Sequence, residues 1–69
     1  MAFNYQKLRG RIKEKGYTQG DVANTIGITP GTFSDKLNNK ASFSTKEVDG
    51  ICKMLGISND EIGSYFFAE

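Results

Sequence analysis

The sequence contains no histidine and no tryptophan, and it has one cysteine and one proline among its 69 residues. The single cysteine, Cys52, cannot form an intramolecular disulfide, and zinc sites of the Cys/His type are excluded without histidine. No apolar stretch approaches the ~20 residues of a membrane-spanning helix, and the first ten residues lack the apolar segment of a signal peptide. These absences predict a cytoplasmic protein that does not insert into a membrane.

The same absences argue against an enzyme. A nucleophilic side chain needs a nearby base, and histidine, the usual one, is missing. Cys52 falls at an apolar position of a helical pattern, so we interpret it as a small core residue. The sequence also has no Gly-rich phosphate loop and no metal-ligand spacing. We therefore expect no catalytic residue, no metal and no cofactor.

Net charge is small, but charge is distributed unevenly along the chain. The formal net charge is +1. Residues 1–40 hold seven basic and three acidic residues, a net of +4, whereas residues 41–69 hold two basic and five acidic residues, a net of −3. The basic half is suited to an anionic surface. The alternative is that these charges only solvate the surface.

Five segments begin with the same arrangement: an apolar residue, then Asn, Ser or Thr, then three residues and a second apolar residue. The polar residue is a predicted N-cap, whose side-chain oxygen accepts a backbone N–H of the first turn. The two apolar residues have the spacing of a hydrophobic staple. The five pairs of apolar and capping residues are Phe3-Asn4, Tyr17-Thr18, Ile28-Thr29, Phe43-Ser44 and Ile57-Ser58.

Other residues mark the limits of these helices. Acidic residues that complete capping boxes stand three positions after the caps at Asp21, Glu47 and Glu61, and Pro30 occupies a first helical position. Glycines stand where a left-handed residue ends a helix, at Gly16, Gly27 and Gly56. The predicted helices are 4–15, 18–26, 29–38, 44–55 and 58–66. No long alternating stretch predicts a strand.

Helical spacing selects one apolar stripe on each predicted helix, and the stripes together predict a single core. The predicted core residues are Tyr5, Leu8, Ile12, Val22, Ala23, Ile26, Phe33, Leu37, Val48, Ile51, Cys52, Leu55, Ile62, Tyr65 and Phe66. Five short helices around one core, with no linker between them, predict one all-α domain over residues 1–69.

The second and third predicted helices are joined by a very short turn around Gly27 and Ile28. Two helices joined so closely pack at a steep angle and need a small residue where they cross, which Ala23 provides. Gly27 can adopt the positive φ that the turn requires, while Ile28 and Phe33 fill the core beneath it. The arrangement predicts a helix-turn-helix.

The segment TQGDVANTIGITPGTFSDKLNNK resembles the helix-turn-helix of the lambda-repressor-like class, which includes the Cro/CI-type and XRE-type regulators. The similarity rests on Gln19, Ala23, Gly27, Ile28 and Phe33. It continues through STKEVDGICKMLGIS, and the YFF ending resembles small phage Cro-like repressors and modulators of repressor. The resemblance implies a compact five-helix DNA-binding domain, acting as a sequence-specific transcriptional regulator in a bacterial cell or a phage-infected host.

The resemblance also implies a binding mode, in which the third helix lies in the major groove and the second crosses the DNA backbone. The implied phosphate contacts are Gln19, Asn38, Lys40 and Ser44. The outward face of helix 29–38, at about 100° per residue, gives as base-facing residues Thr29, Gly31, Thr32, Asp35 and Lys36. Thr32 suits a thymine methyl group, and Asp35 suits a cytosine amine although its charge repels phosphate.

Departures from the class leave a second function open. Pro30 and Gly31 stand where the class often has long side chains that donate to bases, and Lys36 stands where an apolar residue is common. The alternative is a protein-interaction modulator that binds a partner repressor and alters its DNA binding. Asp35 and the acidic C-terminal half supply a surface for such a partner.

Two more surfaces are open to a functional and to a plain structural interpretation. The basic residues of helix 4–15 fall on two sides, with Lys7, Arg11 and Lys15 on one, and Arg9 and Lys13 on the other. One side faces DNA, or both are solvated. The three consecutive aromatics from Tyr65 to Phe67 cannot all enter one core, so they form a homodimer contact or Phe67 packs around the terminus.

Overall fold

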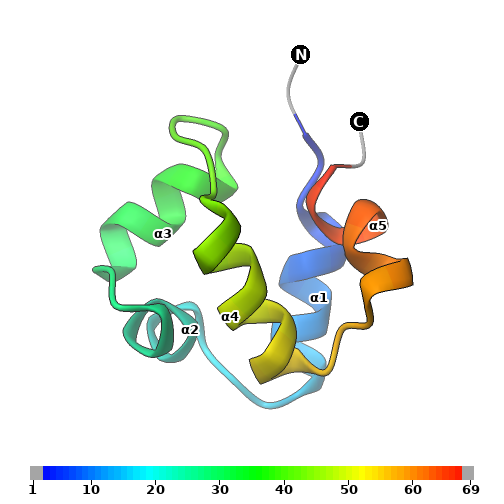
Figure 1. Ribbon diagram of the computed structural model, residues 1–69. Helices are drawn as coiled ribbons and strands as arrows, with labels where there is room; N and C mark the ends of the chain where they lie inside the picture. The colour runs from blue at the N-terminus through cyan, green and yellow to red at the C-terminus, as the bar shows by residue number, and fades with distance from the viewer. Residues whose placement is uncertain (1–2, 68–69) are drawn as a thin grey trace.

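Five α-helices and one 3₁₀ turn form the regular structure of residues 3–67, the part of the chain that the computed structural model describes (Figure 1). The elements are α1 (Gln6–Glu14), α2 (Gln19–Ile26), α3 (Pro30–Leu37), α4 (Thr45–Leu55), η1 (Asn59–Glu61) and α5 (Ile62–Phe66). No strand occurs in this part of the chain, so the all-α prediction is confirmed. The outermost residues of the predicted domain, 1–2 and 68–69, lie outside the described residues.

Capping chemistry explains where α2 and α4 begin. The backbone N–H of Thr18 donates to the Asp21 carboxylate at 2.9 Å, and the backbone N–H of Asp21 donates back to the Thr18 hydroxyl at 3.1 Å. Ser44 and Glu47 make the same reciprocal pair at the start of α4, at 2.8 and 3.2 Å. Each pair satisfies two backbone donors that a helix start leaves open.

The first and last helices differ from the prediction in their opening turns. The N-cap of α1 is Tyr5 rather than Asn4, although the Asn4 side-chain oxygen accepts the backbone N–H of Gln6 at 2.9 Å, which is the kind of bond predicted for it. The last helix opens as the 3₁₀ turn η1, in which the backbone N–H of Glu61 donates to the Ser58 carbonyl at 3.0 Å. Regular α-helix begins only at Ile62.

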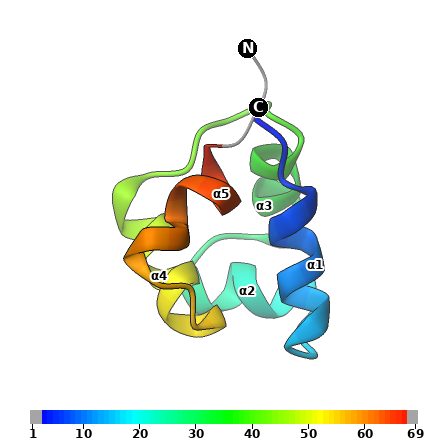
Figure 2. The same ribbon diagram turned by 90° about the vertical axis from the view of Figure 1, so that its right-hand side faces the viewer.

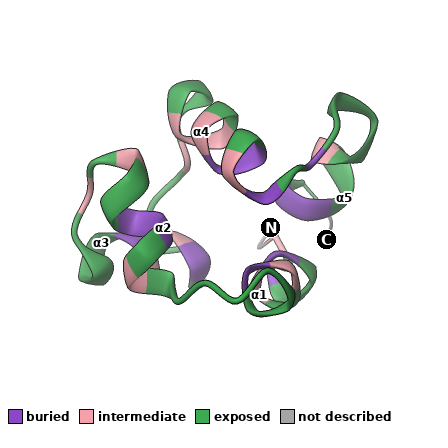
Figure 3. Ribbon diagram, turned by 90° about the horizontal axis from the view of Figure 1, so that it is seen from below, coloured by how far each residue is buried: buried purple, intermediate pink, exposed green. Residues whose placement is uncertain are grey.

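One hydrophobic core joins all five helices. Most predicted core residues are buried, and Ile26, Val48 and Ile62 are partly buried and pack against the others. Ile57, predicted only as a staple residue, is also buried. Buried stretches of the helices face the centre of the molecule in Figure 3. The predicted apolar stripes therefore meet in one place, as helical spacing indicated.

The helices pack in two neighbouring groups. Helix α2 contacts both α3 and α4, while α1 contacts α5. Figure 1 shows α3 and α5 on different sides of α4, and Figure 2 shows α2 below, between α4 and α1. Gly50 brings α4 close to α2, because a Cβ added there would lie 3.1 Å from Ile26 Cγ2. Among the described residues, no helix is long and apolar enough to cross a membrane.

Candidate functional site

Helices α2 and α3 form a tightly joined unit. Gly27 ends α2 with φ 80°, and the backbone N–H of Ile28 then donates to the Ala23 carbonyl at 2.9 Å. Ala23 is fully buried, so a larger side chain at this position would have to displace the residues packed around it. At the other end of α2, a Cβ added to Gly20 would lie 3.9 Å from Pro30 Cγ. The first turns of α2 and α3 are therefore neighbours.

The exposed side of α3 carries four of the five residues that were predicted to face DNA bases. Gly31, Thr32 and Asp35 are exposed, as is the cap residue Thr29. The Thr29 hydroxyl accepts the backbone N–H of Thr32 at 3.2 Å, and the two hydroxyls lie 2.9 Å apart. Because that pair shares one hydrogen bond, one hydroxyl proton stays free to donate outward.

Lys36 lies elsewhere than predicted. Its ammonium donates to the Ser42 carbonyl at 2.8 Å and to the Glu47 carboxylate at 2.9 Å, and it lies 5.9 Å from the centre of the Phe43 ring. The Lys36 side chain is only 12 % exposed. It follows Phe33 by three residues, so it stands on the flank of α3 that faces α4. The charge of Lys36 therefore joins the two helices instead of facing outward.

The Glu47 carboxylate bonds to both Ser44 and Lys36, and these two bonds lower its pKa. Partial burial by itself raises the pKa of the Glu47 carboxyl, but the Ser44 backbone N–H and the Lys36 ammonium outweigh it and hold the pKa below its ordinary value. The carboxylate thus stays ionised while it both caps α4 and pairs with α3. This makes the start of α4 and the flank of α3 one connected unit.

The predicted phosphate contacts differ in whether their hydrogen-bond donors already have a partner within the protein. Gln19 is exposed at the first position of α2, and the capping box leaves its backbone N–H and that of Gly20 without an intrahelical acceptor. Ser44 differs, because its own backbone N–H is already bonded to Glu47. The donors left at the start of α4 are therefore the backbone N–H groups of the next two residues, Thr45 and Lys46.

Asn38 and Lys40 follow the last turn of α3, where both are exposed. The Asn38 side-chain oxygen accepts a bond from the Arg9 guanidinium at 3.2 Å, so α1 reaches the C-terminal end of α3. The backbone N–H of Lys40 donates to the Asp35 carbonyl at 2.8 Å. That bond holds the backbone of the exposed Lys40 against α3.

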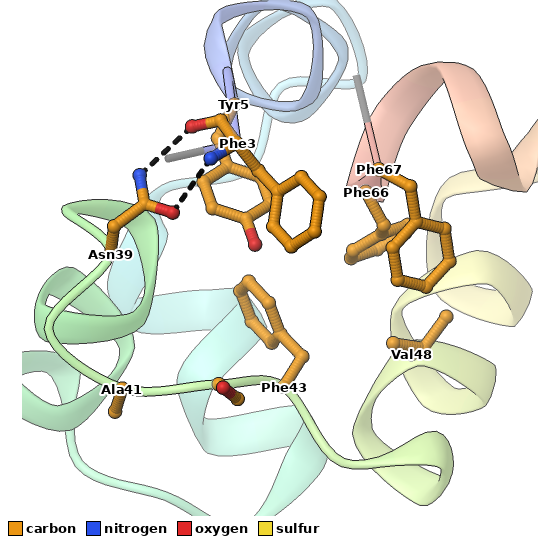
Figure 4. A pocket seen from close by; sticks show the side chains of 9 residues that line it. Phe3, Tyr5, Asn39, Ala41, Phe43, Val48, Phe66 and Phe67 are labelled. Carbon is orange, nitrogen blue, oxygen red and sulfur yellow. Dashed lines mark hydrogen bonds between the residues drawn. The ribbon is translucent and has the colours of Figure 1, made fainter. Parts of the chain in front are cut away.

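Asn39 is a residue that the sequence reasoning missed. Its φ is 63°, and among residues 3–67 it is the only residue other than glycine with a positive φ. Its side chain makes two bonds to Phe3, accepting the backbone N–H at 2.9 Å and donating to the carbonyl at 2.8 Å (Figure 4). Asn tolerates this conformation better than most residues, so the two consecutive asparagines of NNK were the available signal.

The two hydrogen bonds between Asn39 and Phe3 lie at the edge of an apolar groove of about 500 Å³. Aromatic rings surround the groove, and Figure 4 shows them converging on it; the rings belong to Phe3, Tyr5, Phe43, Phe66 and Phe67. The Phe67 ring packs edge-on against the Phe3 ring, with 5.7 Å between the two ring centres, yet Phe67 is 56 % exposed. The ring therefore packs around the terminus and still presents apolar surface to its surroundings.

Cys52 is buried in the core. Burial, helped by the negative charge of Asp49, raises the pKa of its thiol, so the reactive thiolate is disfavoured. Within residues 3–67, no three Cys, Asp or Glu side chains are grouped so that they could hold a metal ion.

Comparison with known proteins identifies a family. The whole chain, residues 1–69, matches the family model described as "Protein of unknown function (DUF739)", and the chain belongs to this family. A search of curated proteins found no match.

Proposed function

We propose that this member of the DUF739 family is a sequence-preferring DNA-binding transcriptional regulator of the lambda-repressor-like class, similar to phage Cro-like repressors. In this proposal α2 and α3 act as a helix-turn-helix, with α3 in the major groove of a double-stranded operator and α2 across the backbone. The chain acts in the cytoplasm of a bacterial cell or a phage-infected host.

The joined α2–α3 unit is the observation that carries the proposal. The left-handed Gly27 and the buried Ala23 fix α3 against α2, so that an exposed side of α3 is left with small polar residues. Gly31 allows close approach of the backbone to a base edge, and Thr32 supplies a methyl group and a hydroxyl. Gln19 stands at one end of this surface and Lys40 at the other.

Groups for phosphate are available at both ends of α3. The open backbone N–H groups at the start of α2 and the Gln19 side chain suit a phosphate at the N-terminal end. Asn38 and Lys40 suit a phosphate at the C-terminal end, and the first turn of α4 after Ser44 adds further N–H donors. Such contacts position the protein on DNA, and they weaken with added salt.

DNA binding by the purified chain tests the proposal. A fluorescently labelled duplex from the region upstream of its gene is titrated at several salt concentrations, beside a scrambled duplex of the same composition. We expect tighter binding to the upstream duplex and an affinity that falls steeply with salt. Equal affinities for both duplexes, or binding that ignores salt, would contradict the proposal.

One observation favours a second function, which is modulation of a partner repressor. The only basic side chain within α3, Lys36, is paired with Glu47, so the exposed side of the helix presents the Asp35 carboxylate without a balancing cation from α3 itself. Such a surface suits a basic protein surface better than phosphate. The test is the operator binding of the repressor encoded beside it, with and without this chain. An unchanged operator affinity would remove this function.

Self-association through the C-terminal aromatics completes the proposal, because a two-fold dimer matches a palindromic operator. The exposed part of Phe67 and the groove beside it supply the surface. Sedimentation over a range of concentrations should show dimers for the wild type and monomers for Phe67→Ser. Tyr17→Ser is the matched control, because Tyr17 is the other large apolar residue exposed among the described residues, at 39 %. Equal dimerisation of both variants would contradict the proposed contact.

A further inference from the structure

The two sides of α1 use their basic residues differently. On one side, the Lys7 ammonium lies 4.7 Å from the centre of the Tyr65 ring. On the same side, the Arg11 guanidinium donates to the Leu55 carbonyl at 3.2 Å and pairs with Glu14 at 2.8 Å. These two cations therefore bind to α5 and to the end of α4, where they have a structural task.

Arg9 lies on the other side of α1, beside the C-terminal end of α3. Its Nη2 donates to Asn38 Oδ1 at 3.2 Å, and the Asn38 amide is near Ser34 Oγ at 3.4 Å. Among residues 3–67, no carboxylate lies within ion-pair distance of Arg9, although Lys36, Arg11 and Lys53 all have one. The Arg9 charge is thus held in place by a neutral side chain and is not cancelled.

This arrangement places an available cation where α3 has none of its own. A guanidinium has five N–H donors in a fixed fork, and the bond to Asn38 uses one of them. The remaining donors can bind a phosphate, which arginine does with two parallel bonds. Lys40 extends from the same end of α3, so two cations flank the point where the DNA backbone would pass.

We propose that Arg9 contacts a DNA backbone phosphate at the C-terminal end of α3, with Asn38 as the residue that positions its guanidinium. This inference rests on the proposed function and adds a residue from outside the helix-turn-helix to it. Arg9 supplies the phosphate contact, while the ammonium of Lys36 holds α3 to α4. The Asp35 charge on the exposed side of α3 is then offset by cations at the end of the helix.

The test compares two variants that remove one positive charge from the same helix. Arg9→Gln and Lys7→Gln are each titrated with one labelled duplex over a series of salt concentrations. We expect Arg9→Gln to lower the salt slope by about one unit, which is about an eightfold loss of affinity near 0.1 M salt. Lys7→Gln should keep the wild-type slope, because its charge lies on the side of α1 that faces α5.

Two further measurements separate contact from folding. Arg9→Lys keeps the charge and loses the fork, so it should recover the salt slope but only part of the affinity. Thermal unfolding of all variants checks that each is folded at the assay temperature. Equal slopes for the wild type and Arg9→Gln would overturn the Arg9 contact alone. Absence of salt-dependent binding by the wild type would overturn the proposed function together with it.

Discussion

The two sides of α3 differ in burial and in the partners of their side chains. On the inner side, each residue has a fixed partner: Phe33 and Leu37 are buried in the core, and Lys36 is bonded to Ser42 and Glu47. On the outer side, Gly31 and Asp35 are exposed, and the side-chain bond of Thr32 is made to its neighbour Thr29. The inner side therefore determines stability, and the outer side is left to determine binding.

This separation is a physical consequence of burial. A side chain enclosed by others cannot be changed without a cavity or an unpaired group. A side chain in water can be exchanged at little cost, usually within about 0.5 kcal/mol. Substitutions on the two sides should therefore change two different measured quantities, the free energy of unfolding and the affinity for a ligand.

The largest expected effect is that of Phe33→Ala on the inner side. The ring is fully buried and packs edge-on against the Phe43 ring, with 5.9 Å between the two ring centres. Its removal should therefore cost about 3–5 kcal/mol of unfolding free energy. For a domain this small, such a loss leaves much of the chain unfolded. Chemical denaturation measures it, with Tyr17→Ala as the control because Tyr17 is an exposed aromatic residue. A similar cost at Tyr17 would contradict the comparison.

Lys36→Met comes next, and it tests whether Lys36 belongs to the inner side. Loss of its bonds to Glu47 and to the Ser42 carbonyl should cost about 1.5–3 kcal/mol of unfolding free energy. Lys53→Met is the control, because its pair with Asp49 at 3.0 Å is exposed, with 78 % and 62 % of the two side chains accessible, and should cost less than about 1 kcal/mol. If Lys36→Met instead lowered DNA affinity at unchanged stability, Lys36 would belong to the outer side.

The same pair gives a pH dependence. Because the pKa of Glu47 is lowered in the folded state, its stabilisation is present above the ordinary pKa of 4.5 and is lost as pH falls through the lower folded value. The unfolding free energy of the wild type should therefore approach that of Glu47→Gln on acidification. Denaturation at neutral pH and below pH 4.5 measures the difference. A difference that stays constant across this range would contradict the ionised pair.

A matched pair of glycine substitutions compares the turn with the outer side. Gly27 has φ 80°, so Gly27→Ala should cost about 1–2 kcal/mol of unfolding free energy through backbone strain. Gly31 is the second residue of α3, and the place that an added Cβ would occupy is open space, so Gly31→Ala should stabilise the protein by at most about 1 kcal/mol.

The same Gly31→Ala protein should bind DNA more weakly, because a methyl group then stands between α3 and the base edges. Stability and binding would move in opposite directions in one variant, which an unfolded fraction cannot produce. Unchanged DNA affinity would show that the backbone of α3 does not approach the bases at Gly31.

Local signals in the sequence predicted the helix starts well. Thr18, Thr29 and Ser44 cap the helices that they were expected to cap, because a cap and its backbone partner lie within three residues of each other. The core was also predictable, since helical spacing alone selects the inward residues. At the last helix the predicted cap Ser58 and its partner Glu61 do form a capping box, but the turn that follows is 3₁₀, and regular α-helix begins only at Ile62. The cap of α1 lies one residue later than predicted, at Tyr5.

The candidate site was less predictable, because its decisive contacts join residues that are far apart in the chain. Lys36 and Glu47 are separated by eleven positions, and Phe3 and Asn39 by 36. The helical angle counted Lys36 among the outward residues of α3, but the direction of its flexible side chain depends on a carboxylate from α4. Likewise, Arg9 and Asn38 meet only once α1 has packed beside α3.

The smallest expected effect on stability belongs to Asp35→Asn, and it separates the two proposed functions. The exposed carboxylate stands near the C-terminal end of α3, where negative charge opposes the helix dipole, so its removal should change the unfolding free energy by less than about 0.5 kcal/mol.

If α3 lies in the major groove, losing the repulsion between Asp35 and phosphate should raise affinity for non-specific DNA. If the exposed side instead meets a basic surface of a partner repressor, the same substitution should weaken that complex and leave DNA affinity unchanged. Parallel titrations with a duplex and with the repressor distinguish the two results, with Asp60→Asn in η1 as a charge-matched control away from α3.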